Sequence, residues 1–154
     1  ESSLDDLTRI FREYGELENA RKVATLICRQ RETGEPILTT SDLKSVLEKL
    51  YSPQTERKFL GKVFQALRIE VNQEMRALED LLCGSKEVLR SGGRLSVITY
   101  HSLEDRIVKN FLRDGKAEGT FSLVNKKPIL PTEEEMAANG RSRSAKLRVA
   151  ERIK

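Results

Sequence analysis

The chain has 154 residues, of which 38% are hydrophobic, 34% are charged and 5% are aromatic, a composition typical of soluble globular domains. No segment approaches the roughly 20 consecutive apolar residues of a membrane span, and the amino end lacks a signal-peptide pattern. Two cysteines without CxxC spacing and a single histidine exclude a disulfide framework and a zinc site. We therefore expect a cytoplasmic protein with reduced thiols and no membrane partner.

The net charge of +4 is concentrated at the carboxyl end, where the last fourteen residues carry six basic side chains and one acidic side chain. A local basic segment is typical of a surface that binds a polyanion such as a nucleic acid. The alternative is a solvated strand edge whose charges discourage aggregation. The segment by itself favours neither interpretation.

Apolar residues at helical spacing predict three short helices in the first fifty residues. The first begins at a cap at Ser2 or Ser3, the second ends before Gly34, and the third begins at a cap within residues 39–41. One apolar face then continues over residues 55–82, which predicts a single helix about 42 Å long. Such a helix can join two modules, with a looser region expected at Gly84.

The pattern changes after Gly92-Gly93. Residues 94–100 form a nearly continuous apolar run, which is typical of a strand covered on both faces in a parallel sheet. A helix follows at once, with Ser102 as the expected N-cap and Asp105 three residues later. The order strand, turn and helix is half of a βαβ unit.

Two further strands are expected. A short strand covers residues 121–124, and Thr132 opens a short helix after it. From Ala145 onward apolar and basic residues alternate, so we expect a strand with a buried apolar face and a basic face that includes Lys154. The chain is thus helical up to about residue 91 and α/β from 92 to 154, and three strands make an incomplete sheet.

The turn after the strand at 94–100 is the candidate site, because ligands of open α/β sheets bind beyond the carboxyl ends of strands. Its polar and aromatic residues are Tyr100, His101, Ser102, Glu104, Asp105 and Arg106. A capping box made by Ser102 and Asp105 is the structural alternative for those two residues. His101 adds nothing to that cap, which leaves it either a catalytic group or a buried supporting histidine.

Several enzyme classes are disfavoured. There is no GxSxG elbow for a hydrolase, and neighbouring carboxylates on a helix diverge by about 100°, which does not suit a glycosidase pair. Gly92-Gly93 precedes its strand, so no glycine-rich nucleotide loop follows a strand.

Five segments in chain order resemble the bacterial MraW/RsmH family. They are VFQALRI at 63–69, VNQE at 71–74, GGRL at 92–95, HSLEDRIVK at 101–109 and RSRSAKLRVAER at 141–152. Members of this family are S-adenosylmethionine-dependent methyltransferases that modify the exocyclic amino group of a cytidine in small-subunit (16S) ribosomal RNA. The resemblance runs from about residue 7 to residue 152.

The resemblance implies an α/β fold, a seven-stranded Rossmann-like methyltransferase domain interrupted by an all-helical insertion. It assigns residues 1–75 to the inserted RNA-recognition domain and residues 76–154 to the carboxy-terminal part of the methyltransferase domain, with only its last three strands. The family's cofactor-binding motifs then precede residue 1. No residue of this chain is expected to bind S-adenosylmethionine, and the chain alone is expected to be inactive.

The implied chemistry suits the candidate turn, since a base splayed out of its stack needs an aromatic contact and polar groups to hold it. The family's Phe-like position is Tyr100 here. The expected pocket residues are His101, Ser102 and Asp105, and the expected substrate-binding residues are Tyr100, Arg106, Arg57, Lys58, Lys62, Arg68, Arg141, Arg143 and Lys146. Each of the basic residues is alternatively a solvated charge.

Two other possibilities stay open. The helical part alone is also compatible with a non-enzymatic module that binds RNA or a protein. The exposed edge of an incomplete sheet favours a homodimer or strand exchange.

Overall fold

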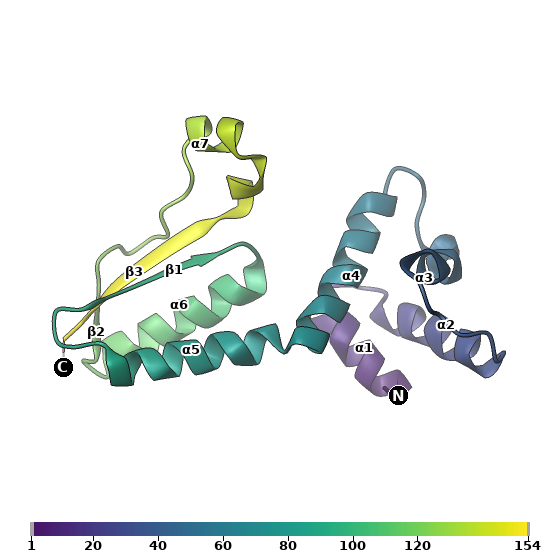
Figure 1. Ribbon diagram of the computed structural model, residues 1–154, viewed down its shortest axis with the longest axis horizontal. Coiled ribbons are helices and arrows are strands. Elements are labelled where there is room, and N and C mark those ends of the chain that lie inside the picture. Colours follow the sequence, from purple (N-terminus) through teal and green to yellow (C-terminus); the bar gives the residue numbers. More distant parts are fainter. Residues whose placement is uncertain (1, 154) are drawn as a thin grey trace. The chain divides into compact units, whose positions relative to one another are not determined.

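The computed structural model describes residues 2–153 and divides the chain into two compact units, Glu1–Glu74 and Met75–Lys154 (Figure 1). Among the described residues, no helix combines the length and the apolar character needed to cross a membrane.

The first unit contains only helices: α1 (Leu4–Glu13), α2 (Ala20–Glu32), α3 (Thr40–Leu47), the 3₁₀ helix η1 (Glu48–Leu50) and α4 (Glu56–Asn72). Ser3 caps α1 and Thr39 caps α3, each in a reciprocal capping box with the Asp three residues later. These caps and the three short helices confirm the sequence prediction. Side chains from all four α-helices meet in one core, in which Phe11, Val23, Leu47 and Val63 are fully buried.

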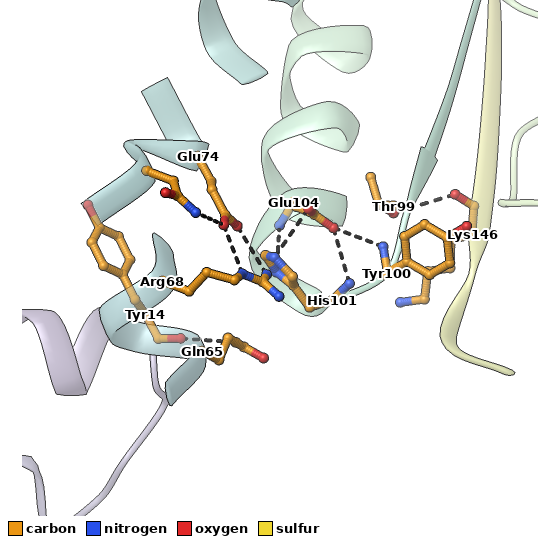
Figure 2. Close-up of polar contacts among 10 residues, drawn as sticks. Tyr14, Gln65, Arg68, Glu74, Thr99, Tyr100, His101, Glu104 and Lys146 are labelled. Carbon is orange, nitrogen blue, oxygen red and sulfur yellow. Dashed lines mark hydrogen bonds and ion pairs between the residues drawn. The ribbon is translucent and has the colours of Figure 1, made fainter. Parts of the chain in front are cut away.

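The predicted single helix over residues 55–82 is wrong. α4 ends at Asn72, Gln73 has a left-handed backbone with φ of 50°, and α5 (Glu74–Val88) then begins. The Glu74 carboxylate accepts two hydrogen bonds from Arg68, at 2.8 and 3.0 Å, and one from Asn72 at 3.2 Å (Figure 2). These contacts stabilise a break that the spacing of apolar residues does not reveal. The looser region expected at Gly84 is also absent, because α5 continues through it.

The second unit consists of a three-stranded sheet and helices. After α5 come β1 (Arg94–Thr99), α6 (Ser102–Ala117), β2 (Phe121–Leu123), α7 (Glu133–Ala138), the 3₁₀ helix η2 (Gly140–Ser144) and β3 (Lys146–Arg152). The strand order is β1-β3-β2, and β3 is antiparallel to both neighbours. β1 and β2 therefore run in the same direction, with the last strand of the chain between them (Figure 1).

β1 is not covered on both faces in this structure. Val97 is buried in a core with Leu82 of α5 and Val108 of α6, whereas Ile98 on the opposite face is 56% exposed. The parallel pairing expected for this strand is also absent among the described residues, because its partner is the antiparallel β3. An apolar run alone does not distinguish these arrangements.

The faces of β3 are the reverse of the sequence prediction. Arg148 lies opposite the buried Val97, so the basic side chains of β3 are on the face that the helices cover. Leu147 lies opposite the exposed Ile98 on the other face. Lys154, expected on the basic face, lies outside the described residues.

Two interactions compensate the positive charges on the covered face of β3. The Asp105 carboxylate on α6 accepts hydrogen bonds from Arg148 Nε at 2.8 Å and from an Arg148 terminal nitrogen at 3.2 Å, and Lys146 Nζ lies 3.4 Å away. Farther along the strand, the Arg152 guanidinium lies 5.6 Å from the centre of the buried Phe121 ring. The charge of Arg148 is thus paired and that of Arg152 rests on an aromatic face.

Within the ion cluster of Asp105, Lys146 and Arg148, the Asp105 and Arg148 side chains are each only 13% exposed, whereas Lys146 is 40% exposed. The hydrogen bond from Arg148 lowers the pKa of Asp105 against the opposing effect of burial, and the positive charges of Arg148 and Lys146 lower it further. Because the pKa is lower in the folded state, the cluster stabilises the fold above the unfolded-state pKa of about 3.9. That stability is lost as the pH falls through the folded-state pKa.

Replacing Asp105 by Asn should therefore destabilise the protein by about 2 to 3 kcal/mol near neutral pH, because it leaves Arg148 buried without a counter-charge. The difference from the wild type should shrink as the pH falls below about 4. Urea unfolding across this pH range measures both effects. Asp114→Asn on the same helix is the control, since this exposed residue forms an ion pair, among the described residues, only with the neighbouring Arg113 and should change stability by less than about 0.5 kcal/mol. A pH-independent difference for Asp105→Asn would contradict the assignment.

Candidate functional site

The candidate site is the short turn that joins β1 to α6. His101, not Ser102, is the N-cap of α6: its backbone is extended, and its Nδ1 accepts a hydrogen bond from the Glu104 N–H at 3.4 Å. In return the Glu104 carboxylate accepts hydrogen bonds from the backbone N–H of Tyr100 at 2.8 Å and of His101 at 3.3 Å (Figure 2). The predicted capping box of Ser102 and Asp105 is therefore wrong by one residue.

The hydrogen bonds of the cap determine whether the ring nitrogens of His101 have a lone pair available to a ligand. Because Nδ1 accepts a hydrogen bond, the neutral imidazole carries its proton on Nε2. Nε2 lies 3.2 Å from Glu104 Oε1, but it is buried and has no well-oriented hydrogen-bond partner among the described residues. The interpretation that His101 adds nothing to the cap is thus wrong, and neither ring nitrogen offers a lone pair to a ligand in this conformation.

The same turn is fixed from a second side by Asp105. Its carboxylate is directed to Lys146 and Arg148 on β3, so the first turn of α6 is tied to the central strand of the sheet. Glu104 and Asp105 are adjacent and diverge around the helix, so one carboxylate holds the turn backbone and the other holds the sheet.

The remaining residues of the turn face solvent. Tyr100 is 53% exposed, and Ser102 and Arg106 are exposed on the first turns of α6. The structure therefore brings the expected pocket residues and Lys146 together at one end of the sheet. Within this group, His101, Asp105 and Lys146 are engaged with other parts of the protein, whereas the Tyr100 side chain is exposed.

The basic residues expected to bind phosphate have different surroundings. Arg141 and Arg143 are exposed on η2. In the first unit Arg57 and Lys58 are exposed on α4, whereas Lys62 Nζ donates a hydrogen bond to the Glu16 carbonyl at 2.9 Å. Arg68 forms the two-pronged ion pair with Glu74 that closes the end of α4.

The roles of two residues differ from the sequence prediction. Glu104 was named among the residues of the turn, but its capping box with His101 was not predicted, because histidine is not among the usual capping residues. Arg148 was placed on an exposed face, and only the register that sets it opposite Val97 reveals its role.

The sequence model of the MraW methylase family matches residues 1–153. The chain is 52% identical over 159 residues to ribosomal RNA small subunit methyltransferase H of Parabacteroides distasonis, an alignment that covers 96% of this chain and 52% of that protein. It is 51% identical to the protein of the same name from Bacteroides fragilis, over 95% of this chain and 52% of the relative.

A third relative of that name, from Flavobacterium johnsoniae, is 48% identical over 96% of this chain and 52% of its own length. The chain thus spans about half the length of these curated relatives. Because the family model matches nearly every residue, the chain belongs to the MraW methylase family.

Proposed function

We propose that this chain is the carboxy-terminal part of a cytoplasmic enzyme that transfers a methyl group from S-adenosylmethionine to the exocyclic amino group of a cytidine in 16S ribosomal RNA. The observation that carries the proposal is the identity of about half of all positions to proteins named ribosomal RNA small subunit methyltransferase H. The choice of a cytidine amino group rests on the family resemblance of the segments around His101 and in residues 141–152.

The sheet supports the proposed architecture. Two like-directed strands with an antiparallel strand between them fit the end of a larger, mostly parallel sheet, and we assign β1, β2 and β3 to the last three strands of a seven-stranded Rossmann-like domain. The outer edge of β1, unpaired among the described strands, is where the remaining strands would join. Residues 1–75 are then the inserted RNA-recognition domain and residues 76–154 the end of the methyltransferase domain. A homodimer through the same edge stays a prediction.

The residues present do not by themselves fit the methyl donor. Among residues 2–153, no glycine-rich turn follows a strand: Thr99 is followed by Tyr100 and His101, and Leu123 is followed by Val124 and Asn125. Such turns are what bring backbone N–H groups close to a nucleotide. We therefore assign no residue of this chain to the donor.

The proposed contribution of this chain is to position the base. An exocyclic amine is a weak nucleophile because its lone pair is delocalised into the ring, so orientation and hydrogen bonding matter more than a strong base. We propose that Tyr100 contacts the splayed base, and that Ser102 and Arg106 contact the nucleotide from the start of α6. His101 and Asp105 are positioning residues that hold this turn.

Calorimetry provides the test of the proposal. The 154-residue chain is expected to show no binding of S-adenosylmethionine, whereas a chain extended at the amino end to the length of its relatives binds it. The extended enzyme should also convert a cytidine of small-subunit RNA to N4-methylcytidine, identified by mass spectrometry of the nucleosides. Donor binding by the short chain would overturn the division of the site, and a methyl group on another atom would overturn the substrate assignment.

The role of His101 is tested in the extended enzyme by comparing two substitutions. His101→Ala removes the cap and should lower turnover by more than it raises the dissociation constant of the donor. His101→Asn should keep most of the turnover, because the Asn side-chain oxygen can accept the hydrogen bond from the Glu104 N–H. Equal loss in both variants would mean that the imidazole itself acts on the substrate, and unchanged turnover in His101→Ala would remove this residue from the site.

A further inference from the structure

The first unit carries a groove that the candidate turn does not include. A pocket of about 560 Å³ lies along α2 and η1, and a pocket of about 420 Å³ lies between the loop before α2 and α4. Glu18, Asn19 and Leu50 line both pockets, so the two adjoin. We call the combined feature the α2–α4 groove.

Half of the basic side chains of the first unit line the groove. Residues 1–74 contain twelve basic and thirteen acidic side chains, yet six of the basic side chains line the groove and only two acidic ones do, Glu16 and Glu18. The basic residues come from three separate elements: Arg21, Lys22 and Arg29 from α2, Lys49 from η1, and Lys58 and Lys62 from α4. A unit without net positive charge thus presents one strongly cationic concave surface.

Four of the six groove cations lack a partner of opposite charge among the described residues: Lys22, Arg29, Lys49 and Lys58. Arg21 forms a long ion pair with the exposed Asp5, at 3.9 Å. Of the other six basic side chains of the unit, three are paired: Arg9 with Glu70, Lys44 with Glu56 and Arg68 with Glu74. The groove therefore leaves its positive charge available to an anionic ligand.

The groove also has apolar walls. Leu17, Leu26, Leu50 and Phe59 line it, and the Phe59 ring is supported by Tyr51 at a centroid distance of 5.4 Å. A cationic groove with aromatic and apolar surface is the usual arrangement for single-stranded nucleic acid, whose phosphates meet the cations while its bases rest on flat side chains. An acidic peptide is the alternative ligand, since it too would supply negative charge.

We propose that the α2–α4 groove binds a single-stranded segment of the ribosomal RNA substrate, with phosphates at Lys22, Arg29 and Lys49 and a base against Phe59. The choice of RNA rests on the proposed function, whereas the site rests on the charge and shape of the groove. It extends the expected phosphate contacts beyond Lys58 and Lys62 to α2 and η1.

The test measures binding of a fluorescein-labelled single-stranded oligonucleotide of small-subunit ribosomal RNA by anisotropy over a range of salt. The groove variant is Lys22→Gln, Arg29→Gln and Lys49→Gln together. The control variant, Arg12→Gln, Lys109→Gln and Lys116→Gln, removes the same charge from exposed positions that do not line the groove. Thermal unfolding by circular dichroism verifies that both variants fold.

The groove variant should bind RNA at least about tenfold more weakly near 0.1 M salt, and its plot of log affinity against log salt should be shallower by about 2, the expectation for three lost phosphate contacts on a single strand. The control variant should stay within about twofold of the wild type. Equal behaviour of the two variants would overturn the proposal.

Competition with poly-glutamate distinguishes an acidic protein partner. If the groove variant loses binding of poly-glutamate but keeps wild-type affinity for RNA, the groove binds acidic protein and the RNA assignment is wrong. Product analysis in the extended enzyme separates this proposal from the proposed reaction. Loss of RNA binding by the groove variant supports the groove even if the product is not N4-methylcytidine.

Discussion

The ion pair between Asp105 and Arg148 is the interaction on which the second unit's candidate site depends. It connects the first turn of α6 to β3, the strand that pairs with both other strands of the sheet. A buried ion pair adds little stability relative to a well-packed apolar pair, but losing one partner costs several kcal/mol. Its effect is therefore to fix one arrangement of helix and sheet, which in turn fixes the turn that carries Tyr100 and Ser102.

Two neighbouring carboxylates hold this turn in place through different partners. Glu104 bonds back to the N–H groups of Tyr100 and His101, and Asp105 reaches across to the sheet. Acidic residues in the first turn also suit the positive end of the helix dipole. His101, Glu104 and Asp105 are thus mostly structural, whereas Tyr100 and Arg106 are exposed. Under the proposed function, this turn orients its nucleotide by shape and contact, as methylation of an amine requires.

Local features of the fold were predictable from the sequence because they depend on residues close together in the chain. The capping boxes at Ser3 and Thr39 follow from an oxygen-bearing side chain and an Asp three residues later. Features set by distant residues were not predictable. The break at Gln73 depends on where Arg68 and Asn72 reach, and the covered basic face of β3 depends on a register that only the folded sheet defines.

The candidate site was likewise predictable only in part. The turn after residue 99 was identified from chain order alone, but the shift of the cap to His101 followed from an unusual capping side chain. The α2–α4 groove could not have been found in the sequence, because its cations are spread over three elements. Because the net charge of residues 1–74 is near zero, that total does not reveal that these cations lie on one surface.

The dependence of the turn on the Asp105–Arg148 pair is tested most directly by a double-mutant cycle. The free energy of urea unfolding is measured near pH 7 for the wild type, Asp105→Asn, Arg148→Gln and the double variant. We predict that the double variant is less destabilised than the sum of the single variants by about 2 kcal/mol, because its buried groups are both neutral. Effects that add to within about 0.5 kcal/mol would mean that the two residues act independently, and would contradict the dependence of the turn on their ion pair.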